Sequence, residues 1–209
     1  AAASRVAAGG AVTGLDRNAG MLDAARRAAP ALDWREGVAE RLPFQDAAFD
    51  AVGCQFGLMF FEDRAKALGE MWRVLRPGGR LAVAVWDMAE RSPGYAAMIA
   101  LLDRLFGRAV ADALRAPFVL GDPAEVRATF AGAGIPAAQI ETMQCSAHFP
   151  SIEAWVHTDI KGWILADMID DAQYAALQRA ARGELARFAR ADGTVLFDAP
   201  AHIVSAEKA

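Results

Sequence analysis

The chain has 209 residues, of which 55% are hydrophobic and 23% charged, and its formal net charge is −4 at pH 7. This composition is typical of a globular protein, and the length favours one domain with an embedded helical lid. The slight negative charge argues against the basic surface with which proteins attract nucleic acid or anionic membranes. A small molecule is therefore the expected partner.

The cysteines and histidines indicate neither a disulfide-rich protein nor a metal-binding one. Cys54 and Cys145 lie far apart and form neither a disulfide framework nor a zinc motif, which favours a reducing, cytoplasmic location. His148, His157 and His202 are scattered and indicate no metal site. Charged residues interrupt every apolar run before it reaches the roughly 18 residues of a membrane helix. The oligomeric state cannot be read from the sequence.

The first third of the chain alternates between strand and helix patterns. Residues 1–8 are alanine-rich and predict the end of a helix, stopped by Gly9 and Gly10. A strand over residues 11–15 ends at Asp16, and the next helix carries Met21, Leu22, Ala25 and Ala28 on one face before Pro30.

The alternation continues to residue 86. Strands are predicted over residues 32–36, 49–54 and 80–86, with a helix over 63–75 and a tight turn at Pro77, Gly78 and Gly79. Residues 51–54 and 81–85 are apolar on both faces, which predicts central strands covered by helices on both sides. This order is typical of an α/β protein with a parallel sheet.

Beyond Asp87 the pattern becomes mainly helical. Helices are expected over residues 93–106, from Asp122-Pro123 to 130, over 151–169 and over 171–189. Two late strands, 140–149 and 195–206, predict an antiparallel sheet edge.

Three segments together resemble class I S-adenosylmethionine-dependent methyltransferases, the group that includes quinone-biosynthesis enzymes. They are GLDRNAGML (residues 14–22), GVAERLPFQDAAFDAV (37–52) and EMWRVLRPGGRLAVAVW (70–86). The resemblance implies a Rossmann-like, doubly wound sheet that is mostly parallel, has an antiparallel C-terminal edge and carries a helical lid. It assigns residues 1–87 to cofactor binding, 88–135 and 149–190 to the lid, and 138–148 and 194–206 to the last strands.

The resemblance places S-adenosyl-L-methionine beside the ends of three strands. Asp16 stands where the family has an acid that accepts both ribose hydroxyls, because a carboxylate can accept two hydrogen bonds with charge assistance. An N-cap for the following helix is the competing interpretation of Asp16. Arg17 and Met21 are expected along the adenosine, although Met21 also suits a helix core.

The next two strand ends supply the remaining cofactor candidates. The strand over residues 32–36, which corresponds to the family's third strand, is followed by Val38, Ala39 and Glu40. Val38 replaces the aspartate with which the family accepts a hydrogen bond from the adenine amine. Adenine recognition would then need backbone groups, Glu40 or water. Gln55 and Phe56 are expected to border the sulfur and the amino-acid end, with ordinary packing as the alternative for Phe56.

The family's first strand and its Gly-x-Gly-x-Gly loop have no counterpart in the given residues. Gly9, Gly10 and Gly14 follow a helix and precede a strand, which is the wrong context for that loop. The first strand would lie at the sheet centre, between the strands ending at Asp16 and Cys54. Each buried backbone group left unpaired there costs about 1–3 kcal/mol, so we expect the biological chain to be longer.

The expected activity is methyl transfer to a small apolar or aromatic metabolite. Such a reaction mainly requires alignment of the acceptor with the methyl group, and His157 is the candidate base for O-methylation. A surface histidine is the competing interpretation of His157. Two other functions stay open: an inactive cofactor-binding or interaction module of the same fold, and a nicotinamide-dependent oxidoreductase, since an acid after the second strand also suits NAD.

Overall fold

The computed structural model of the protein describes residues 4, 6, 9–135, 137–162 and 164–209. Most of the helix predicted over residues 1–8 lies outside these residues. The eight strands are β1 (Thr13–Asp16), β2 (Asp33–Glu36), β3 (Phe49–Gln55), β4 (Leu75–Trp86), β5 (Gln139–Met143), β6 (Ser146–Phe149), β7 (Val195–Asp198) and β8 (Ala201–Glu207). The seven α-helices are α1 (Ala19–Ala28), α2 (Arg64–Val74), α3 (Pro93–Phe106), α4 (Arg108–Arg115), α5 (Pro123–Gly132), α6 (Ile152–Lys161) and α7 (Asp171–Glu184).

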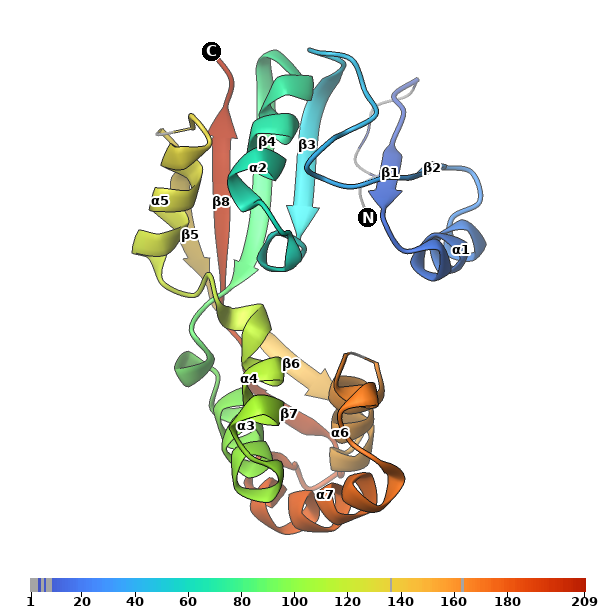
Figure 1. The fold of residues 1–209 in the computed structure, drawn as a ribbon, viewed down its shortest axis with the longest axis vertical. Coiled ribbons are helices and arrows are strands. Elements are labelled where there is room, and N and C mark those ends of the chain that lie inside the picture. Colours follow the sequence, from blue (N-terminus) through green and yellow to red (C-terminus); the bar gives the residue numbers. More distant parts are fainter. Residues whose placement is uncertain (1–3, 5, 7–8, 136, 163) are drawn as a thin grey trace.

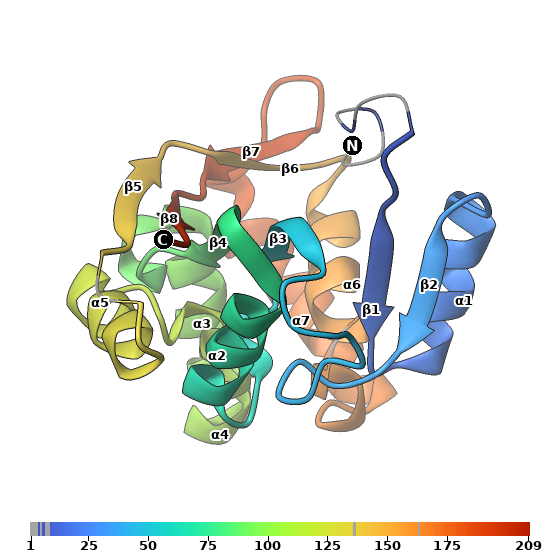
Figure 2. The same ribbon diagram turned by 90° about the horizontal axis from the view of Figure 1, so that it is seen from above.

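The described strands form three separate sheets. β1 pairs with β2 in parallel, and a four-stranded sheet has the order β3-β4-β8-β5. Within that sheet β3 and β4 are parallel, whereas β8 runs antiparallel to both β4 and β5. β6 and β7 form an antiparallel pair that leads into the helical part. Across the molecule the order is β5, β8, β4, β3, β1, β2, with an interruption between β3 and β1 (Figures 1 and 2).

This arrangement confirms the predicted α/β class and its antiparallel C-terminal edge. β8 joins β4 from Arg80↔Glu207 to Trp86↔Ala201, so the end of the chain extends the sheet beside the last parallel strand. The helices begin where the capping residues predict. Asp63 caps α2 and Asp122 caps α5, the latter with Pro123 as the first helical residue.

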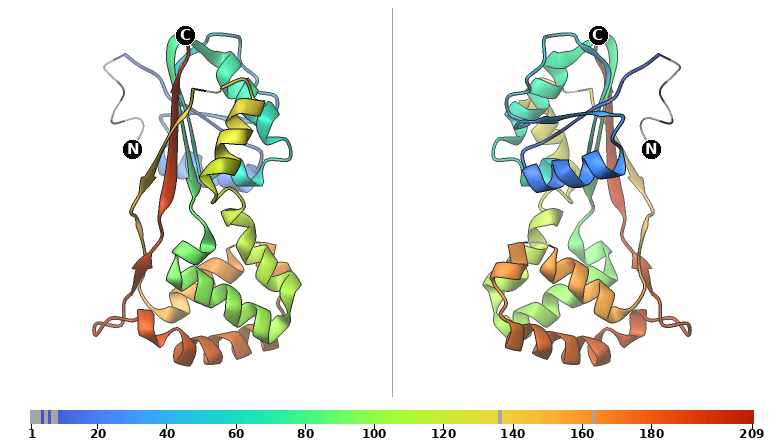
Figure 3. Two further views of the ribbon diagram at one scale, coloured as in Figure 1. Left: turned by 90° about the vertical axis from the view of Figure 1, so that its left-hand side faces the viewer. Right: turned by 90° about the vertical axis from the view of Figure 1, so that its right-hand side faces the viewer.

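The prediction that residues 51–54 and 81–85 are covered on both faces is wrong. β3 lies at the edge of its sheet, and Ala51, Gly53 and Ala82 are exposed. Helices α2 and α5 lie together on one face of the four-stranded sheet, and Figure 3 shows them on the same side. On the opposite face Ala51, Gly53 and Ala82 are open to solvent, whereas Ala84 is buried.

The turn predicted at residues 77–79 falls within β4, where the pairing with β3 shifts register between Phe49↔Leu75 and Ala51↔Arg80. Gly78 has a positive φ of 73°, as a tight turn requires, but Gly79 does not. Lys208, near the end of the chain, supplies backbone hydrogen-bond partners for Gly78 and Gly79. The N–H of Gly78 donates to the carbonyl of Lys208 at 2.7 Å, and the N–H of Lys208 donates to the carbonyl of Gly79 at 2.9 Å.

The predicted strand over residues 140–149 is two strands in different sheets. β5 pairs with β8, whereas β6 pairs with β7. The chain changes sheet at Cys145, whose carbonyl accepts a hydrogen bond from the N–H of Ala199. The long helices predicted over 151–169 and 171–189 also end earlier, as α6 and α7, each followed by a short 3-10 turn.

Two hydrophobic cores hold the molecule together. One lies between the four-stranded sheet and helices α2 and α5, and includes Leu68, Leu81 and Phe130. The other lies among α3, α4, α6 and α7, with Trp155 and Phe197 at its centre. Figure 1 shows the second group of helices below the carboxyl ends of β3 and β4. No helix among the described residues is long and apolar enough to cross a membrane.

A buried polar junction connects the sheet to the helices below it. Nε2 of His202 donates to the carbonyl of Gly121 at 2.9 Å, and Nδ1 lies 2.9 Å from the hydroxyl of Thr142. Oδ1 of Asp87 lies 3.4 Å from Nε2 of His202. Both His202 and Asp87 are almost fully buried. Gly121 allows this close approach, because a Cβ there would lie 2.4 Å from the backbone nitrogen of Met88.

We predict that Gly121→Ala lowers the free energy of unfolding by about 1–3 kcal/mol, because the added methyl meets backbone that cannot rotate away. The matched control is Gly132→Ala at the end of α5, where a Cβ meets no atom within 4 Å. That variant is expected to be neutral or slightly more stable. Urea unfolding followed by circular dichroism measures both, and equal effects in the two variants would contradict the prediction.

The carboxylate of Asp159 is buried in the core among helices α3, α4, α6 and α7. Asp159 is 5% exposed, and its Oδ2 accepts a hydrogen bond of 2.7 Å from Nε1 of Trp155. Burial raises the pKa of Asp159 from an ordinary 3.8 to about 7, and the Trp155 hydrogen bond only partly offsets this rise. Burial, together with the nearby charge of Asp159, raises the pKa of Tyr95 as well.

We therefore predict that stability decreases as pH rises from 4 towards 8. Between 3.8 and about 7 the folded protein holds a proton on Asp159 that the unfolded chain has lost, so rising pH favours unfolding by on the order of 4 kcal/mol in total. Asp159→Asn, which stays neutral and can still accept from Trp155, should remove this dependence. Asp171→Asn, an exposed change in the same helical region, should retain it. Urea titrations at several pH values measure the free energy of unfolding. If this free energy changes with pH in the same way in the wild type and in Asp159→Asn, Asp159 is not the group responsible.

Candidate functional site

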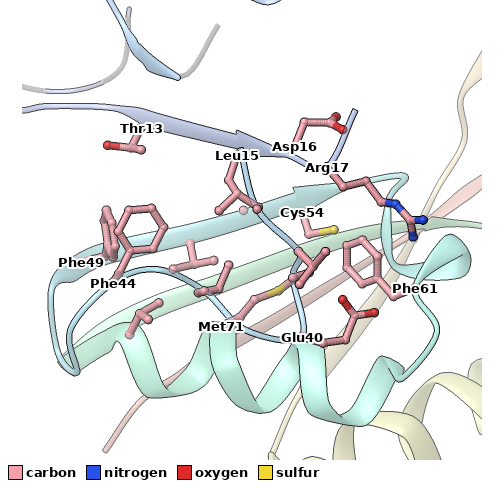
Figure 4. Close-up of a pocket in the computed structure, with 18 of the residues that line it drawn as sticks. Thr13, Leu15, Asp16, Arg17, Glu40, Phe44, Phe49, Cys54, Phe61 and Met71 are labelled. Carbon is pink, nitrogen blue, oxygen red and sulfur yellow. The ribbon is translucent and has the colours of Figure 1, made fainter. Parts of the chain in front are cut away.

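A cavity of about 370 Å³ occupies the interruption between β1 and β3 (Figure 4). One side is formed by β1 and the other by β3, with the segment after β2 and the inner face of α2 completing the walls. The lining residues are Thr13, Leu15, Asp16, Arg17, Gly37, Val38, Ala39, Glu40, Leu42, Phe44, Phe49, Ala51, Val52, Gly53, Cys54, Gln55, Gly57, Phe61, Met71 and Val74. We call this cavity the slot.

The walls of the slot are apolar along its length and polar at one end. Phe44 and Phe49 pack edge to face, with ring centroids 4.9 Å apart, at the end that Figure 4 shows opposite Asp16. Burial raises the pKa of the Cys54 thiol, which keeps this lining residue neutral at physiological pH. The charged groups are therefore confined to the carboxyl ends of the strands, whereas the apolar length of the slot lies where the sequence predicts the family's first strand.

Asp16 stands at the polar end, where β1 finishes. Its Oδ1 accepts a hydrogen bond of 2.8 Å from the N–H of Asn18. Asn18, and not Asp16, caps α1, since the Asn18 side chain accepts from the N–H of Met21. The N-cap interpretation of Asp16 is therefore wrong, and the carboxylate is oriented by the turn beside the slot.

Arg17 and Glu40 complete the polar end. Nη1 of Arg17 lies 3.6 Å from a carboxylate oxygen of Glu62, and both side chains are mostly exposed. Glu40 approaches the same place, because its Oε1 accepts a hydrogen bond of 3.0 Å from the N–H of Glu62. Glu62 is thus the acid that approaches Arg17, whereas the carboxylates of Asp16 and Glu40 line the slot. Acidic groups at this end favour a ligand that carries positive charge.

Val38 and Ala39 occupy the turn after β2. Val38 forms an isolated antiparallel bridge with Arg41 and is 41% exposed, so its side chain borders the open part of the slot. Ala39 is buried in the sheet core and contributes to the wall. Met21, in contrast, is 59% exposed and is not among the lining residues, so the predicted apolar face of α1 contains Leu22 but not Met21.

The two candidates at the end of β3, Gln55 and Phe56, lie in different environments. Gln55 lines the slot. Phe56 instead stacks on Trp86, with ring centroids 3.8 Å apart and planes at 5°, and packs towards the sheet core. Its φ of 54° is rare for a residue other than glycine, and it marks the sharp turn with which the chain leaves the sheet. Phe56 therefore packs against the core, as in the alternative interpretation, and does not line the slot.

His157 lies on the exposed side of α6, apart from the slot. Its Nδ1 is 3.4 Å from the hydroxyl of Tyr174 on α7, and Tyr174 in turn accepts from Nε2 of Gln178. The described residues contain no group of three or more histidine, cysteine or acidic side chains that is able to hold a metal ion.

Several lining residues carried no signal in the sequence. Leu15, Phe44, Met71 and Val74 read as ordinary core positions, because a pocket wall and a hydrophobic core have the same pattern. Only the separation of β1 from β3 turns these side chains towards a cavity.

Comparison with known proteins agrees with the sequence motifs. Residues 1–83 match a family model described as a methyltransferase domain. A demethylmenaquinone methyltransferase from Deinococcus radiodurans is 50% identical over 76 residues, which are 34% of this chain and 32% of that protein. The chain thus spans about a third of the length of this curated relative.

Solved structures extend the similarity to the whole fold. A methyltransferase-like structure from Bacillus halodurans superposes with a TM-score of 0.59 at 18% identity, covering 95% of this chain and 83% of the other. A phosphoethanolamine N-methyltransferase from Haemonchus contortus, solved with S-adenosylhomocysteine, gives a TM-score of 0.52 at 16% identity and covers 94% and 43%. At these identities the likeness concerns the fold. The solved structures thus show a Rossmann-like fold for this chain, and residues 1–83 are similar to a methyltransferase domain.

Proposed function

We propose that this protein is an enzyme that transfers a methyl group from S-adenosyl-L-methionine to a small apolar or aromatic acceptor, leaving S-adenosyl-L-homocysteine. The observation that carries the proposal is the position of Asp16, a carboxylate held by Asn18 at the carboxyl end of β1, beside an apolar slot. Ligands of open α/β sheets bind outside the carboxyl ends of the strands, where the chain reverses direction across the sheet.

The residues at the polar end fit the cofactor. The Asp16 carboxylate has a second oxygen in addition to the one that Asn18 engages, which suits it to the ribose diol. Val38 and Glu40 would flank the adenine, and Gln55 would face the amino-acid end. The sulfonium and ammonium groups outweigh the carboxylate of S-adenosylmethionine by one positive charge, which matches the carboxylates of Asp16, Glu40 and Glu62.

The chemistry needs little from the protein beyond orientation. When bound, S-adenosylmethionine supplies a methyl group that its sulfonium already activates. The chain's own residues would hold the nucleoside, exclude water through the apolar walls and place an acceptor in line with the methyl group. His157 has no part in this proposal, because its ring faces Tyr174 on the outer side of α6.

An apolar acceptor is supported by the surroundings of the slot. Phe61 lines the slot, and the adjoining Phe60 is 48% exposed on the 3-10 turn η2 (Leu58–Phe60). That turn contacts η4 (Ala116–Phe118) of the helical part, which is followed by Val119, 49% exposed. An apolar molecule would bury these side chains favourably. The demethylmenaquinone methyltransferases match only about a third to two fifths of the chain, so their named substrate is a starting point for an acceptor screen.

We predict that Asp16→Asn weakens binding of S-adenosylhomocysteine by about 10- to 100-fold, which corresponds to loss of a charge-assisted hydrogen bond. Asparagine keeps the turn with Asn18, so the fold should survive. Asp23→Asn on the exposed side of α1, where Asp23 pairs only with Arg26, is the matched control and should bind normally. Calorimetric titration, with NADH as a second ligand, measures these affinities. Absence of binding to the wild type would favour an inactive module, and preferential binding of NADH would favour an oxidoreductase.

We further predict that Val38→Asp tightens S-adenosylhomocysteine binding by about 10-fold, because the new carboxylate would accept a hydrogen bond from the adenine amine. Met143→Asp introduces a carboxylate at a similarly exposed apolar residue of β5, at the opposite edge of the four-stranded sheet, and should have no effect. Affinity for S-inosylhomocysteine, in which a carbonyl replaces the amine, should not rise in Val38→Asp. If Val38→Asp gained the same affinity for S-adenosylhomocysteine and for S-inosylhomocysteine, the adenine amine would not lie beside residue 38.

A further inference from the structure

The segment that forms one wall of the slot is held from outside by a single arginine. Arg73 lies near the end of α2, and it is not among the lining residues. Its Nη1 donates to the carbonyl of Phe44 at 2.9 Å and to Oδ1 of Asp46 at 2.6 Å. Its Nη2 donates to the carbonyl of Leu42 at 3.2 Å. One guanidinium therefore engages three residues of the segment between β2 and β3.

Glu70 completes this arrangement from the preceding turn of α2. Its two carboxylate oxygens accept from Nε and Nη2 of Arg73 at 2.7 and 2.8 Å, which fixes the plane of the guanidinium. The same Oε2 accepts from the N–H of Leu42 at 2.8 Å. The arginine hydrogen bond is the main reason that the pKa of Glu70 lies below its ordinary value. The carboxylate thus stays charged and keeps both partners at physiological pH.

The held segment would not take this path unaided. Ala47 has a φ of 55°, a conformation that alanine rarely adopts, and its N–H donates to the carbonyl of Arg73 at 3.1 Å. Residues 38–47 otherwise contain only an isolated bridge between Val38 and Arg41 as regular pairing. Without the contacts to α2, this segment would lose most of its fixed backbone hydrogen bonds.

The same segment forms the slot wall. Val38, Ala39, Glu40, Leu42 and Phe44 all line the cavity, and Figure 4 shows Glu40 and Phe44 at its opposite ends. Arg73 and Glu70 thus lie behind the wall and fix Leu42 and Phe44 by their backbones.

We propose that Arg73, oriented by Glu70, is a positioning residue that orders residues 38–47 before the ligand arrives and thereby sets the affinity of the slot for the nucleoside. This inference rests on the proposed function for the identity of the ligand. Ordering a flexible wall at the moment of binding costs free energy, and a wall ordered in advance avoids that cost. The planar fork of arginine is required, because a lysine ammonium has three donors on one atom and cannot span these acceptors.

The test compares Arg73→Lys with Arg76→Lys. Arg76 pairs with Asp50 at 2.6 Å on the surface, so the control makes the same change three residues along the chain with no contact to the wall. Hydrogen exchange followed by mass spectrometry should show residues 38–47 exchanging at least about 10-fold faster in Arg73→Lys, with β3 and β4 unchanged. Calorimetry should show S-adenosylhomocysteine binding about 10-fold more weakly to that variant. Saturating ligand should restore the protection of residues 38–47, because binding then supplies the missing order.

Three results would overturn the positioning role. These are unchanged exchange in residues 38–47, faster exchange throughout β3 and β4 as in a general loss of stability, and protection that saturating ligand does not restore. Failure of the proposed function is distinguishable from these outcomes. In that case the wild type would not bind S-adenosylhomocysteine, whereas the exchange of the unliganded variants would still show whether Arg73 orders the wall.

Discussion

The Arg73 guanidinium connects the small sheet of β1 and β2 to the four-stranded sheet. β1 and β2 form a small sheet of their own, and the chain passes from it to β3 through residues 37–48. This passage contains little regular pairing, yet Arg73 and Glu70 bind its backbone at Leu42 and Phe44. The position of the first sheet relative to the second therefore depends on a side-chain network at the end of α2.

The slot exists because β1 and β3 belong to different sheets. Strand edges that face each other without pairing leave room between them, and the side chains of Leu15, Val52 and Cys54 line that space. Since both strands end at the same side, Asp16 and Gln55 come together although 39 positions separate them. The result is an apolar cavity with its charged groups at the carboxyl ends of the strands, which is the arrangement that the proposed methyl transfer requires.

The helical region depends on its own core. Trp155 and Phe197 lie at the centre of an aromatic cluster, and the carboxylate of Asp159 is buried beside it. Its attachment to the sheet passes through the junction of Gly121, His202 and Asp87. With Thr142, this junction combines residues of four different segments, so the orientation of the helical part is coupled to the strand β8.

The sequence by itself determined the α/β class, most helix starts and the antiparallel edge, because capping residues and the alternation of apolar residues act locally. Only the tertiary structure decided which strands lie at an edge, that Met21 is exposed, that Phe56 stacks on Trp86 and that His157 faces Tyr174. It also showed that Arg73 binds a wall about 30 residues earlier in the chain. Contacts at such separations depend on how the elements pack, and a single sequence carries no local pattern for them.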